Sequence, residues 1–307
     1  MRTTREIIRH AFQNYRPVLA FSGGGDSAVL LDIVTEMGYR PPLVFADSQM
    51  EYPATVEHVK AQAEKYGLPL TIAKAEITPQ QNWQKNGYPM LGKMAARLWM
   101  QKHRGAKDAG LKIDVSTCCR KMKIAPARKA IHNLSCNANM TGQRGGEDDQ
   151  LRGLREFKEG AIRYQKTDDL TVINPLIGWT DTMVARYTAA HNLPIHPLKS
   201  QGALTIGCIY CGGGAQFDNS GFRVLRHTDP AAFRRMLVEY DFAPIIIAIR
   251  YDCHIDTARA AIDACGGTEQ LIKDRPHVFD FLRHKPLKGY DRTGPDIDIR
   301  KAKHGEA

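Results

Sequence analysis

The short segment SGGGDS, residues 22 to 27, places glycines, hydroxyls and a carboxylate directly after an apolar run. Glycines between a strand and a helix let backbone N–H groups approach a phosphate, and the helix N-terminus favours negative charge. The carboxylate of Asp26 would repel a bare pyrophosphate, but it could ligate a Mg²⁺ ion that bridges to the phosphates. The segment therefore predicts a site for Mg²⁺ and nucleotide phosphates, formed by Ser22, Gly23, Gly24, Gly25, Asp26 and Ser27.

Other interpretations of the same turn remain open. Gly23, Gly25 and Ala28 fit the G-x-G-x-x-A spacing of a dinucleotide-binding turn, and Asp47 follows roughly 20 residues later. A Walker A loop is excluded because no Gly-Lys-Ser/Thr follows the glycines. A glycine turn without any ligand is the last alternative. The hydroxyls and the carboxylate favour a Mg²⁺–nucleotide site.

Four of the seven cysteines form two close pairs. Cys118 and Cys119 are adjacent, and Cys208 and Cys211 make a C-x-x-C pattern. Four thiolates can ligate zinc or an iron–sulfur cluster, and adjacent cysteines suit zinc poorly because its ligand pairs are usually spaced further apart. We expect a 4Fe–4S cluster, with a vicinal disulfide or inert buried thiols as the alternatives.

Positive charge is concentrated between residues 93 and 129. The 307-residue chain has a formal net charge of +10, and this stretch holds eleven Lys and Arg residues against two acidic ones. Such a stretch favours a polyanionic partner such as nucleic acid; a solvated helical face is the alternative. Lys93 and Arg128 are candidate phosphate contacts. Trp99 is a candidate for base stacking, with a core position, which is more usual for a lone tryptophan in a helix, as the alternative.

Neither a membrane segment nor secretion is predicted. No apolar run approaches the roughly 20 residues that cross a bilayer. The N-terminal residues carry charges throughout and contain no apolar signal core. We therefore expect a cytoplasmic protein whose cysteines are thiols or ligands, not a disulfide framework.

Alternating strands and helices must position these residues. Apolar runs at 17–21, 41–47 and 69–75 predict strands, and 26–38 and 52–67 predict the helices between them. Further strands are expected within 135–144 and 170–176, followed by a helix at 180–192. The pattern predicts an α/β fold, a Rossmann-like, doubly wound parallel sheet of about five strands, with a smaller, mainly helical C-terminal region.

Several motifs together resemble the phosphoadenosine phosphosulfate reductase family, whose fold is adenine nucleotide alpha hydrolase-like. SGGGDS is similar to the S-G-G-x-D-S loop of N-type ATP pyrophosphatases, and CCRKMKIAPARKAI resembles the family's Cys-Cys segment. Residues 174–211 match its Pro-Leu-x-x-Trp to Gly-Cys-x-x-Cys block, and FADSQMEYPATVEHV resembles the stretch after its second strand. The resemblance implies a family domain at 1–215 and a helical region at 216–307 that binds substrate or a partner.

The resemblance also implies roles for particular residues. Asp26, Ser27 and Arg144 are the implied catalytic residues, the last from a Gly-x-Arg loop. Asp47 and Ser48, after the second strand, are implied nucleoside contacts. The implied cofactors are ATP, Mg²⁺ and a 4Fe–4S cluster on Cys118, Cys119, Cys208 and Cys211.

Two departures from the family's assimilatory reductases affect the expected reaction. Those enzymes use a cysteine in a C-terminal Glu-Cys-Gly-Leu-His motif, and neither Cys253 nor Cys265 has that context. The cluster-bearing reductases also tend to have a degraded glycine loop, whereas this loop is intact. The chain thus most resembles the adenylating branch, in particular the ATP pyrophosphatase of bacterial DNA phosphorothioation systems.

The expected function is ATP-dependent adenylation of an acceptor oxygen, with release of pyrophosphate, for sulfur insertion into nucleic acid. DNA is the favoured acceptor and tRNA the alternative, with a cysteine desulfurase or another protein as sulfur donor. An APS or PAPS reductase that makes sulfite, a tRNA thiolase and a non-catalytic nucleotide-binding or cluster-sensing protein remain alternatives. The oligomeric state is open, with a homodimer as one option.

Overall fold

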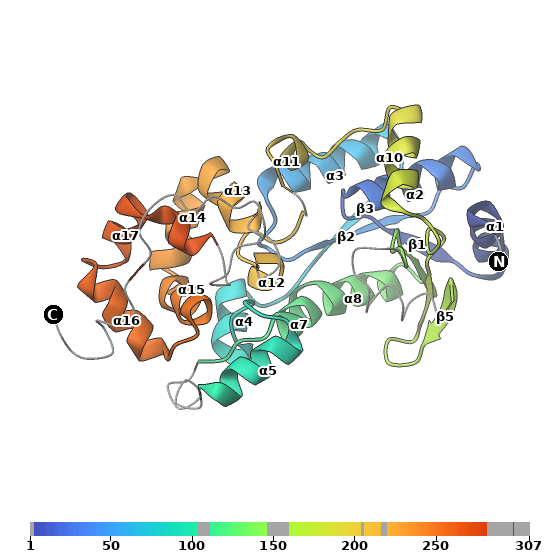
Figure 1. Ribbon diagram of the computed structural model, residues 1–307. Helices are drawn as coiled ribbons and strands as arrows, with labels where there is room; N and C mark the ends of the chain where they lie inside the picture. The colour runs from blue at the N-terminus through green and yellow to red at the C-terminus, as the bar shows by residue number, and fades with distance from the viewer. Residues whose placement is uncertain are drawn as a thin grey trace. The chain divides into compact units, whose positions relative to one another are not determined.

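The computed structural model describes residues 3–103, 111–145, 160–203, 206–215, 220–280 and 297 (Figure 1). The chain divides into two compact units, one made of Met1–Glu76 and Lys121–Pro197, the other of Ile77–Arg120 and Leu198–Ala307. This division by packing differs from the boundary after residue 215, which stays a prediction about the extent of the family domain.

The first unit contains a six-stranded sheet in the order β3-β2-β1-β4-β6-β5. All neighbouring strands are parallel except β5, which runs antiparallel to β6. The predicted α/β fold with a mostly parallel sheet is confirmed, and β5 is an edge strand that the sequence pattern did not indicate. The strands are β1 (Pro17–Ala20), β2 (Leu43–Asp47), β3 (Leu70–Lys74), β4 (Ala138–Met140), β5 (Ile162–Gln165) and β6 (Leu170–Ile173).

Helices cover both faces of this sheet, as a doubly wound fold requires. Figure 1 shows α2, α3 and α10 along one face and α8 along the other. Because strand side chains alternate between faces, Leu19 and Phe45 pack into one core cluster while Val18 and Val44 pack with Ile131 of α8. The helices of this unit are α1 (Thr4–Asn14), α2 (Gly25–Glu36), α3 (Pro53–Lys65), α8 (Ala125–Asn133) and α10 (Asp181–Ala190).

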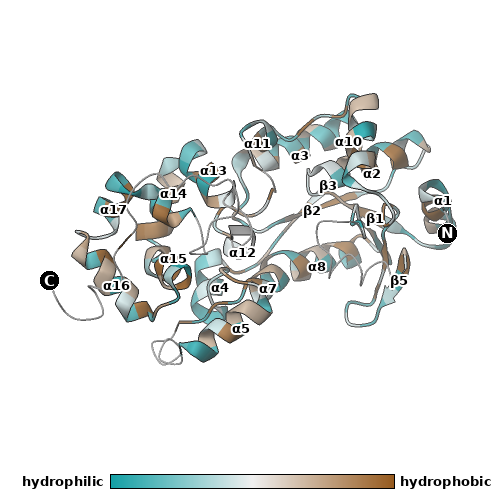
Figure 2. Ribbon diagram, in the orientation of Figure 1, coloured by the Kyte–Doolittle hydropathy of each residue, from teal (hydrophilic) through white to brown (hydrophobic). Residues whose placement is uncertain are grey.

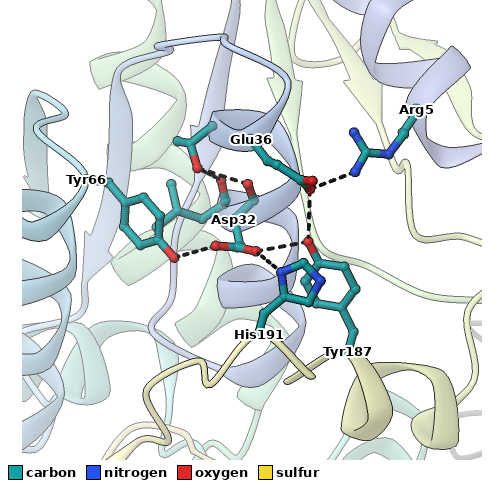
Figure 3. Close-up of polar contacts among 8 residues, drawn as sticks. Arg5, Asp32, Glu36, Tyr66, Tyr187 and His191 are labelled. Atoms are coloured by element: carbon teal, nitrogen blue, oxygen red, sulfur yellow. Dashed lines mark hydrogen bonds and ion pairs between the residues drawn. The ribbon is translucent and has the colours of Figure 1, made fainter. Parts of the chain in front are cut away.

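A polar network fixes α10 to α2 (Figure 3). Asp32 of α2 accepts hydrogen bonds from the hydroxyls of Tyr66 at 2.8 Å and Tyr187 at 2.9 Å, and His191 Nδ1 lies 3.2 Å from the same carboxylate. The rings of Tyr187 and His191 stack with centroids 3.9 Å apart. The network therefore holds the helix that begins at Asp181 against the helix that begins beside the glycine turn.

The second unit is helical in the residues that the structure describes. Its α15 is apolar along nearly its whole length and is almost fully buried (Figure 2). No helix in the described part of the chain is long and apolar enough to cross a membrane. The helices are α4 (Pro79–Asn86), α5 (Lys93–Lys102), α7 (Val115–Cys119), α12 (Gly212–Ala215), α13 (Ser220–Thr228), α14 (Pro230–Val238), α15 (Phe242–Tyr251), α16 (Ile255–Ala264), α17 (Thr268–Asp274) and η2 (Pro276–Phe279).

Two short elements lie where the chain passes between the units. A π-helical turn, η1 (Arg120–Ile124), follows the Cys118–Cys119 pair directly, and α11 (Pro197–Ser200) precedes the C-x-x-C pair. Single-turn π-helices are rare and occur frequently at functional sites. The sequence pattern gave no sign of this turn.

Candidate functional site

The glycine turn adopts a conformation that requires glycine at Gly23. Its φ of +76° is in the left-handed region, and an added Cβ would lie 3.0 Å from Val59 Cγ2 and 3.3 Å from His58 Cδ2. Gly24 is the N-cap of α2, and it has no side chain that could accept a hydrogen bond from the first N–H groups of the helix. The first N–H groups of α2 have no intrahelical acceptor, as at any helix start, so the turn presents them to an anion.

The two serines of the turn have different surroundings. Ser22 is exposed, whereas Ser27 is 5% exposed. Ser27 Oγ donates to the carbonyl of Gly24 at 2.8 Å, and the two serine hydroxyls lie 3.2 Å apart. In this state Ser27 shapes the turn, and Ser22 is the more accessible hydroxyl for a phosphate oxygen.

The turn lies at the switch point of the sheet, where such folds bind ligands outside the carboxyl ends of the strands. From β1 the chain proceeds through β2 and β3 to one side, and β4 pairs with β1 on the other side. The loop after β4 approaches α2 so closely that a Cβ on Gly142 would lie 2.8 Å from the backbone of Asp26. Gly142 is the glycine of the Gly-x-Arg loop, and the structure adds that only a residue without a side chain fits at this approach.

Arg144 comes from that loop and lies between two carboxylates. Its Nε is 3.1 Å from Asp26 Oδ1, and its Nη2 donates to Asp181 Oδ1 at 2.5 Å. Burial alone would lower the pKa of Arg144, but Asp26 and Asp181 outweigh burial and raise it. The structure thus brings together two predicted site residues, Asp26 and Arg144, and adds Asp181, the first residue of α10.

Asp47 and Ser48 lie at the end of β2, next to β1 in the sheet. Their polar atoms bond to neighbouring residues of the protein. Asp47 accepts from the N–H of Gln49 at 2.8 Å and lies 3.1 Å from Lys74 Nζ. Ser48 Oγ donates to Glu51 Oε1 at 2.6 Å. Both residues are buried. Their role as nucleoside contacts stays a prediction.

Two buried histidines lie behind the glycine turn, and sequence reasoning did not single them out. The rings of His58 and His196 have centroids 5.0 Å apart, and His196 Nε2 is 3.0 Å from Thr55 Oγ1. Burial lowers the pKa of His58. These side chains fill the space beside Gly23 and set the position of the turn.

The four cysteines of the two pairs all belong to the second unit. The pKa of both Cys118 and Cys211 is raised to about 12, mainly by burial and in addition by the thiols of neighbouring cysteines, among them Cys208. The structure therefore gathers the four thiols within electrostatic range of one another. Across the described ranges, no three His, Cys, Asp or Glu side chains come together so that they could hold a metal ion. The thiols thus form no ready site for a single ion, and their role as cluster ligands stays a prediction.

One amide donor is directed at the sulfur of Cys211. The N–H of Gly213 donates to Cys211 Sγ at 3.4 Å, and the Cys211 N–H donates to the Cys208 carbonyl at 3.1 Å. A Cβ on Gly213 would lie 3.3 Å from Cys211 Sγ. Amide donors to cysteine sulfur stabilise thiolate ligands and tune iron–sulfur clusters.

Four basic side chains of the stretch between residues 93 and 129 are engaged in ion pairs. Lys123 lies 2.9 Å from Glu51, Arg128 2.8 Å from Asp168, and Lys129 2.6 Å from Glu76; Lys102 pairs with Asp252. Arg104 and Lys107 lie outside the described residues. The charge available to a nucleic acid is therefore smaller than the sequence count indicates.

Trp99 is only 7% exposed, so the expectation that it stacks on a base is wrong for this state. It packs in α5 with its ring 4.9 Å from that of His103. Its ring packs in the interior of the helical unit, as is usual for tryptophan in an amphipathic helix.

The family profile and the curated relatives indicate one family. The family profile described as "Phosphoadenosine phosphosulfate reductase domain" matches residues 16–213. A phosphoadenosine 5'-phosphosulfate reductase of Thiocapsa roseopersicina is 29% identical over 66% of this chain and 75% of its own length. An adenosine 5'-phosphosulfate reductase of Lysinibacillus sphaericus is 30% identical over 67% and 78%. The crystal structure of a PAPS reductase from Candida auris superposes with a TM-score of 0.48 at 22% identity over 67% of this chain and 88% of that one.

Proposed function

The chain belongs to the phosphoadenosine phosphosulfate reductase family, and within that family we propose that it cleaves ATP between the α- and β-phosphates. AMP is transferred to an acceptor oxygen and pyrophosphate leaves. The observation that carries this proposal is the position of Asp26, a carboxylate at the N-terminus of α2 that lies 3.1 Å from Arg144.

A carboxylate at this position indicates which form of phosphate the turn accepts. A bare anion at a helix N-terminus would be repelled by Asp26, so a phosphate group without a metal is poorly matched. Mg²⁺ prefers one or two carboxylates together with phosphate oxygens. The pair of Asp26 and Arg144 therefore supports a metal–polyphosphate ligand, with Asp26 for the metal and Arg144 for the phosphate.

The residues of the turn would act mainly by positioning. The N–H groups at the start of α2 hold the β,γ-phosphates, and Ser22 donates a hydroxyl hydrogen bond. Arg144 places its charge where negative charge grows as the bond from the α-phosphorus to the bridging oxygen breaks. Mg²⁺, when bound, neutralises charge on the leaving pyrophosphate.

The later steps and the partners are part of the same proposal. The outer sulfur of a persulfide on a cysteine desulfurase or another donor attacks the adenylated acceptor, and AMP leaves with the acceptor oxygen. A thiol reductant then cleaves the disulfide that joins donor and acceptor. Nucleic acid, with DNA before tRNA, supplies the acceptor. A 4Fe–4S cluster on the four cysteines would supply electron-transfer or sulfur chemistry. The basic stretch supports the nucleic-acid partner only weakly, because several of its side chains are paired.

A second candidate, the reduction of adenosine 5'-phosphosulfate or its 3'-phosphorylated form to sulfite, is supported by the relatives. They are named as reductases of these two compounds, and by name they favour this candidate over ATP cleavage. The same turn would bind the phosphates of either nucleotide. A thiol would have to attack the sulfate sulfur; Cys253 is 3% exposed and so a poor candidate.

One experiment separates the two candidates. Anaerobically prepared protein is given ATP with Mg²⁺, or either phosphosulfate with a thiol reductant, and AMP, pyrophosphate and sulfite are measured. Stoichiometric AMP and pyrophosphate from ATP are expected. Sulfite from a phosphosulfate, without pyrophosphate from ATP, would establish the second candidate in place of the first.

A further inference from the structure

A buried histidine nitrogen lies close to the glycine turn and has no hydrogen-bond partner. His58 of α3 is 9% exposed. Its Nε2 atom is fully buried and has no partner in the part of the chain that the structure describes. A buried polar atom that stays unpaired costs stability, so such an atom in a native fold calls for an explanation. The steps proposed above give this nitrogen no role.

The glycine turn packs directly against this histidine ring. A Cβ on Gly23 would lie 3.3 Å from His58 Cδ2, which is one of the two ring carbons bonded to Nε2. The unpaired nitrogen is therefore one bond away from the ring atom that lies nearest to the turn. Gly24, the next residue along the chain, is the N-cap of α2. The glycine backbone thus separates His58 from the N–H groups at the start of α2.

A second histidine fixes the position of the ring. The rings of His58 and His196 have centroids 5.0 Å apart, and His196 Nε2 lies 3.0 Å from Thr55 Oγ1, one turn before His58 in α3. A Cβ on Gly23 would also lie 3.7 Å from His196 Cδ2. Among the described contacts, His196 is the only titratable side chain against the His58 ring. Burial alone lowers the pKa of His58, with no contribution from a charged side chain.

The charge on the far side of the glycine backbone changes sign when a phosphate binds. Without a ligand, the N–H groups at the start of α2 present partial positive charge, which opposes a positive charge on a nearby imidazole. Nucleotide phosphates keep a net negative charge even with Mg²⁺ bound, and negative charge favours the charged form of a histidine close to it. Because His58 is buried, salt screens this interaction only weakly. Binding at the turn and protonation of His58 therefore favour each other.

We propose that His58 is a positioning residue of the phosphate turn: nucleotide phosphates bound at the start of α2 draw a proton from solvent onto its imidazole, and the resulting imidazolium behind Gly23 strengthens the binding of those phosphates. No bond of the nucleotide forms or breaks in this step. The proposal rests on the phosphate site at residues 22–27 that the proposed function requires. It depends neither on the reaction that follows nor on the cysteines.

The test counts the protons that the full chain takes up when it binds α,β-methylene-ATP with Mg²⁺, an analogue that cannot be cleaved between the α- and β-phosphates. Titration calorimetry at pH 6.5 is repeated in buffers with different enthalpies of ionisation, and the dependence of the heat on the buffer gives the number of protons. His58→Gln removes the titrating ring and keeps a polar side chain. His132→Gln is the matched control, because His132 is an exposed histidine of the same unit.

Wild type and His132→Gln are expected to take up more protons than His58→Gln. They should also bind the analogue about threefold more tightly at pH 6 than at pH 8, relative to the same ratio in His58→Gln, because a histidine whose pKa rises on binding favours the complex at low pH. If His58→Gln does not fold, His58→Asn replaces it, and NMR of the wild-type imidazole resonances must show one histidine whose pKa rises with the analogue.

Three results would overturn the proposal: equal proton uptake in wild type and His58→Gln, release of protons by wild type relative to the variant, or a wild-type chain that does not bind the analogue. Cleavage of ATP is assayed separately on the same samples. Proton uptake through His58 without AMP from ATP therefore counts only against the proposed function, and AMP formation without that uptake counts only against the role of His58.

Discussion

Arg144 Nε lies 3.1 Å from Asp26 Oδ1, which joins the loop after β4 to the first turn of α2. The other end of the guanidinium is held by Asp181 at the start of α10. The two carboxylates restrict the rotation of the Arg144 guanidinium, so this group is already oriented to bind a phosphate. Under the proposed function, Asp26 would hold the metal and Arg144 would contact the phosphate oxygens of the bound nucleotide.

Substitutions of Arg144 and of Asp181 should separate the contribution of the Arg144 charge from the contribution of its orientation. Arg144→Gln is expected to reduce pyrophosphate release by about 100-fold, since a phosphate clamp is lost. Asp181→Asn keeps Arg144 but loosens it, so we expect a weaker affinity for ATP and a kcat within about tenfold of wild type. Steady-state kinetics and ATP titrations measure both. A larger kcat loss in Asp181→Asn than in Arg144→Gln would contradict the assigned roles.

Gly142→Ala tests the close approach between the β4 loop and α2. The added Cβ would lie 2.8 Å from the backbone of Asp26, which has no flexible side chain to move aside. We expect a loss of about 1–3 kcal/mol in unfolding free energy and weaker ATP binding. Gly178→Ala is the control, because nothing lies within 4 Å of its added Cβ. Unfolding in urea distinguishes them, and equal stabilities would refute the steric argument.

Acid should destabilise the first unit through His58. Burial lowers the folded pKa of His58 below 6.5, so below about pH 6.5 the unfolded chain binds more protons than the folded one. Its contribution to stability is complete above that pH and is lost as the pH falls toward the folded pKa. His58→Gln should therefore lose less stability than wild type between pH 7 and 5, measured as Tm. The exposed His132→Gln is the control and should follow wild type; a wild-type-like slope in His58→Gln would be the contrary result.

The network at Asp32 should support stability without taking part in the chemistry. Asp32→Asn weakens two tyrosine hydrogen bonds and the contact with His191, and we expect a loss of about 1–3 kcal/mol. Tyr187→Phe removes the hydroxyl that donates to Asp32 at 2.9 Å and, at the long distance of 3.5 Å, to Glu36, and it should cost about 0.5–1.5 kcal/mol. Urea unfolding of both variants measures this, with kcat for ATP expected near wild type. A stability equal to wild type in Asp32→Asn would show that the contacts around Asp32 in Figure 3 do not stabilise the fold.

The local pattern was sufficient to predict the strand, turn and helix around SGGGDS. An apolar run, glycines and helical spacing are properties of adjacent residues, and the structure places β1, Gly23–Gly24 and α2 there. The edge strand β5 was missed because its sequence IRYQ has no continuous apolar run and lies half-exposed. A strand of this kind forms because β6 offers it a partner, which its own residues do not reveal.

The rest of the site depends on contacts between distant segments. Asp181 meets Arg144 because α10 is fixed to α2, and Gly142 approaches the backbone of Asp26 although the two lie far apart in the sequence. Neither relation leaves a periodic signal in the sequence. The division into two discontinuous units also depends on contacts between distant segments, because the chain leaves the first unit at Glu76 and returns at Lys121.

The central claim is that Asp26 serves the cleavage of ATP at the glycine turn, and product analysis with ATP labelled in the α-phosphate tests it most directly. Wild type and Asp26→Asn are incubated with Mg²⁺ and the labelled nucleotides are separated, with near-UV circular dichroism as the control for folding. We predict AMP, with an equal amount of pyrophosphate, from wild type, and a decrease of about 100-fold or more in Asp26→Asn. Undiminished AMP formation by a folded Asp26→Asn, or ADP as the wild-type product, would contradict the claim.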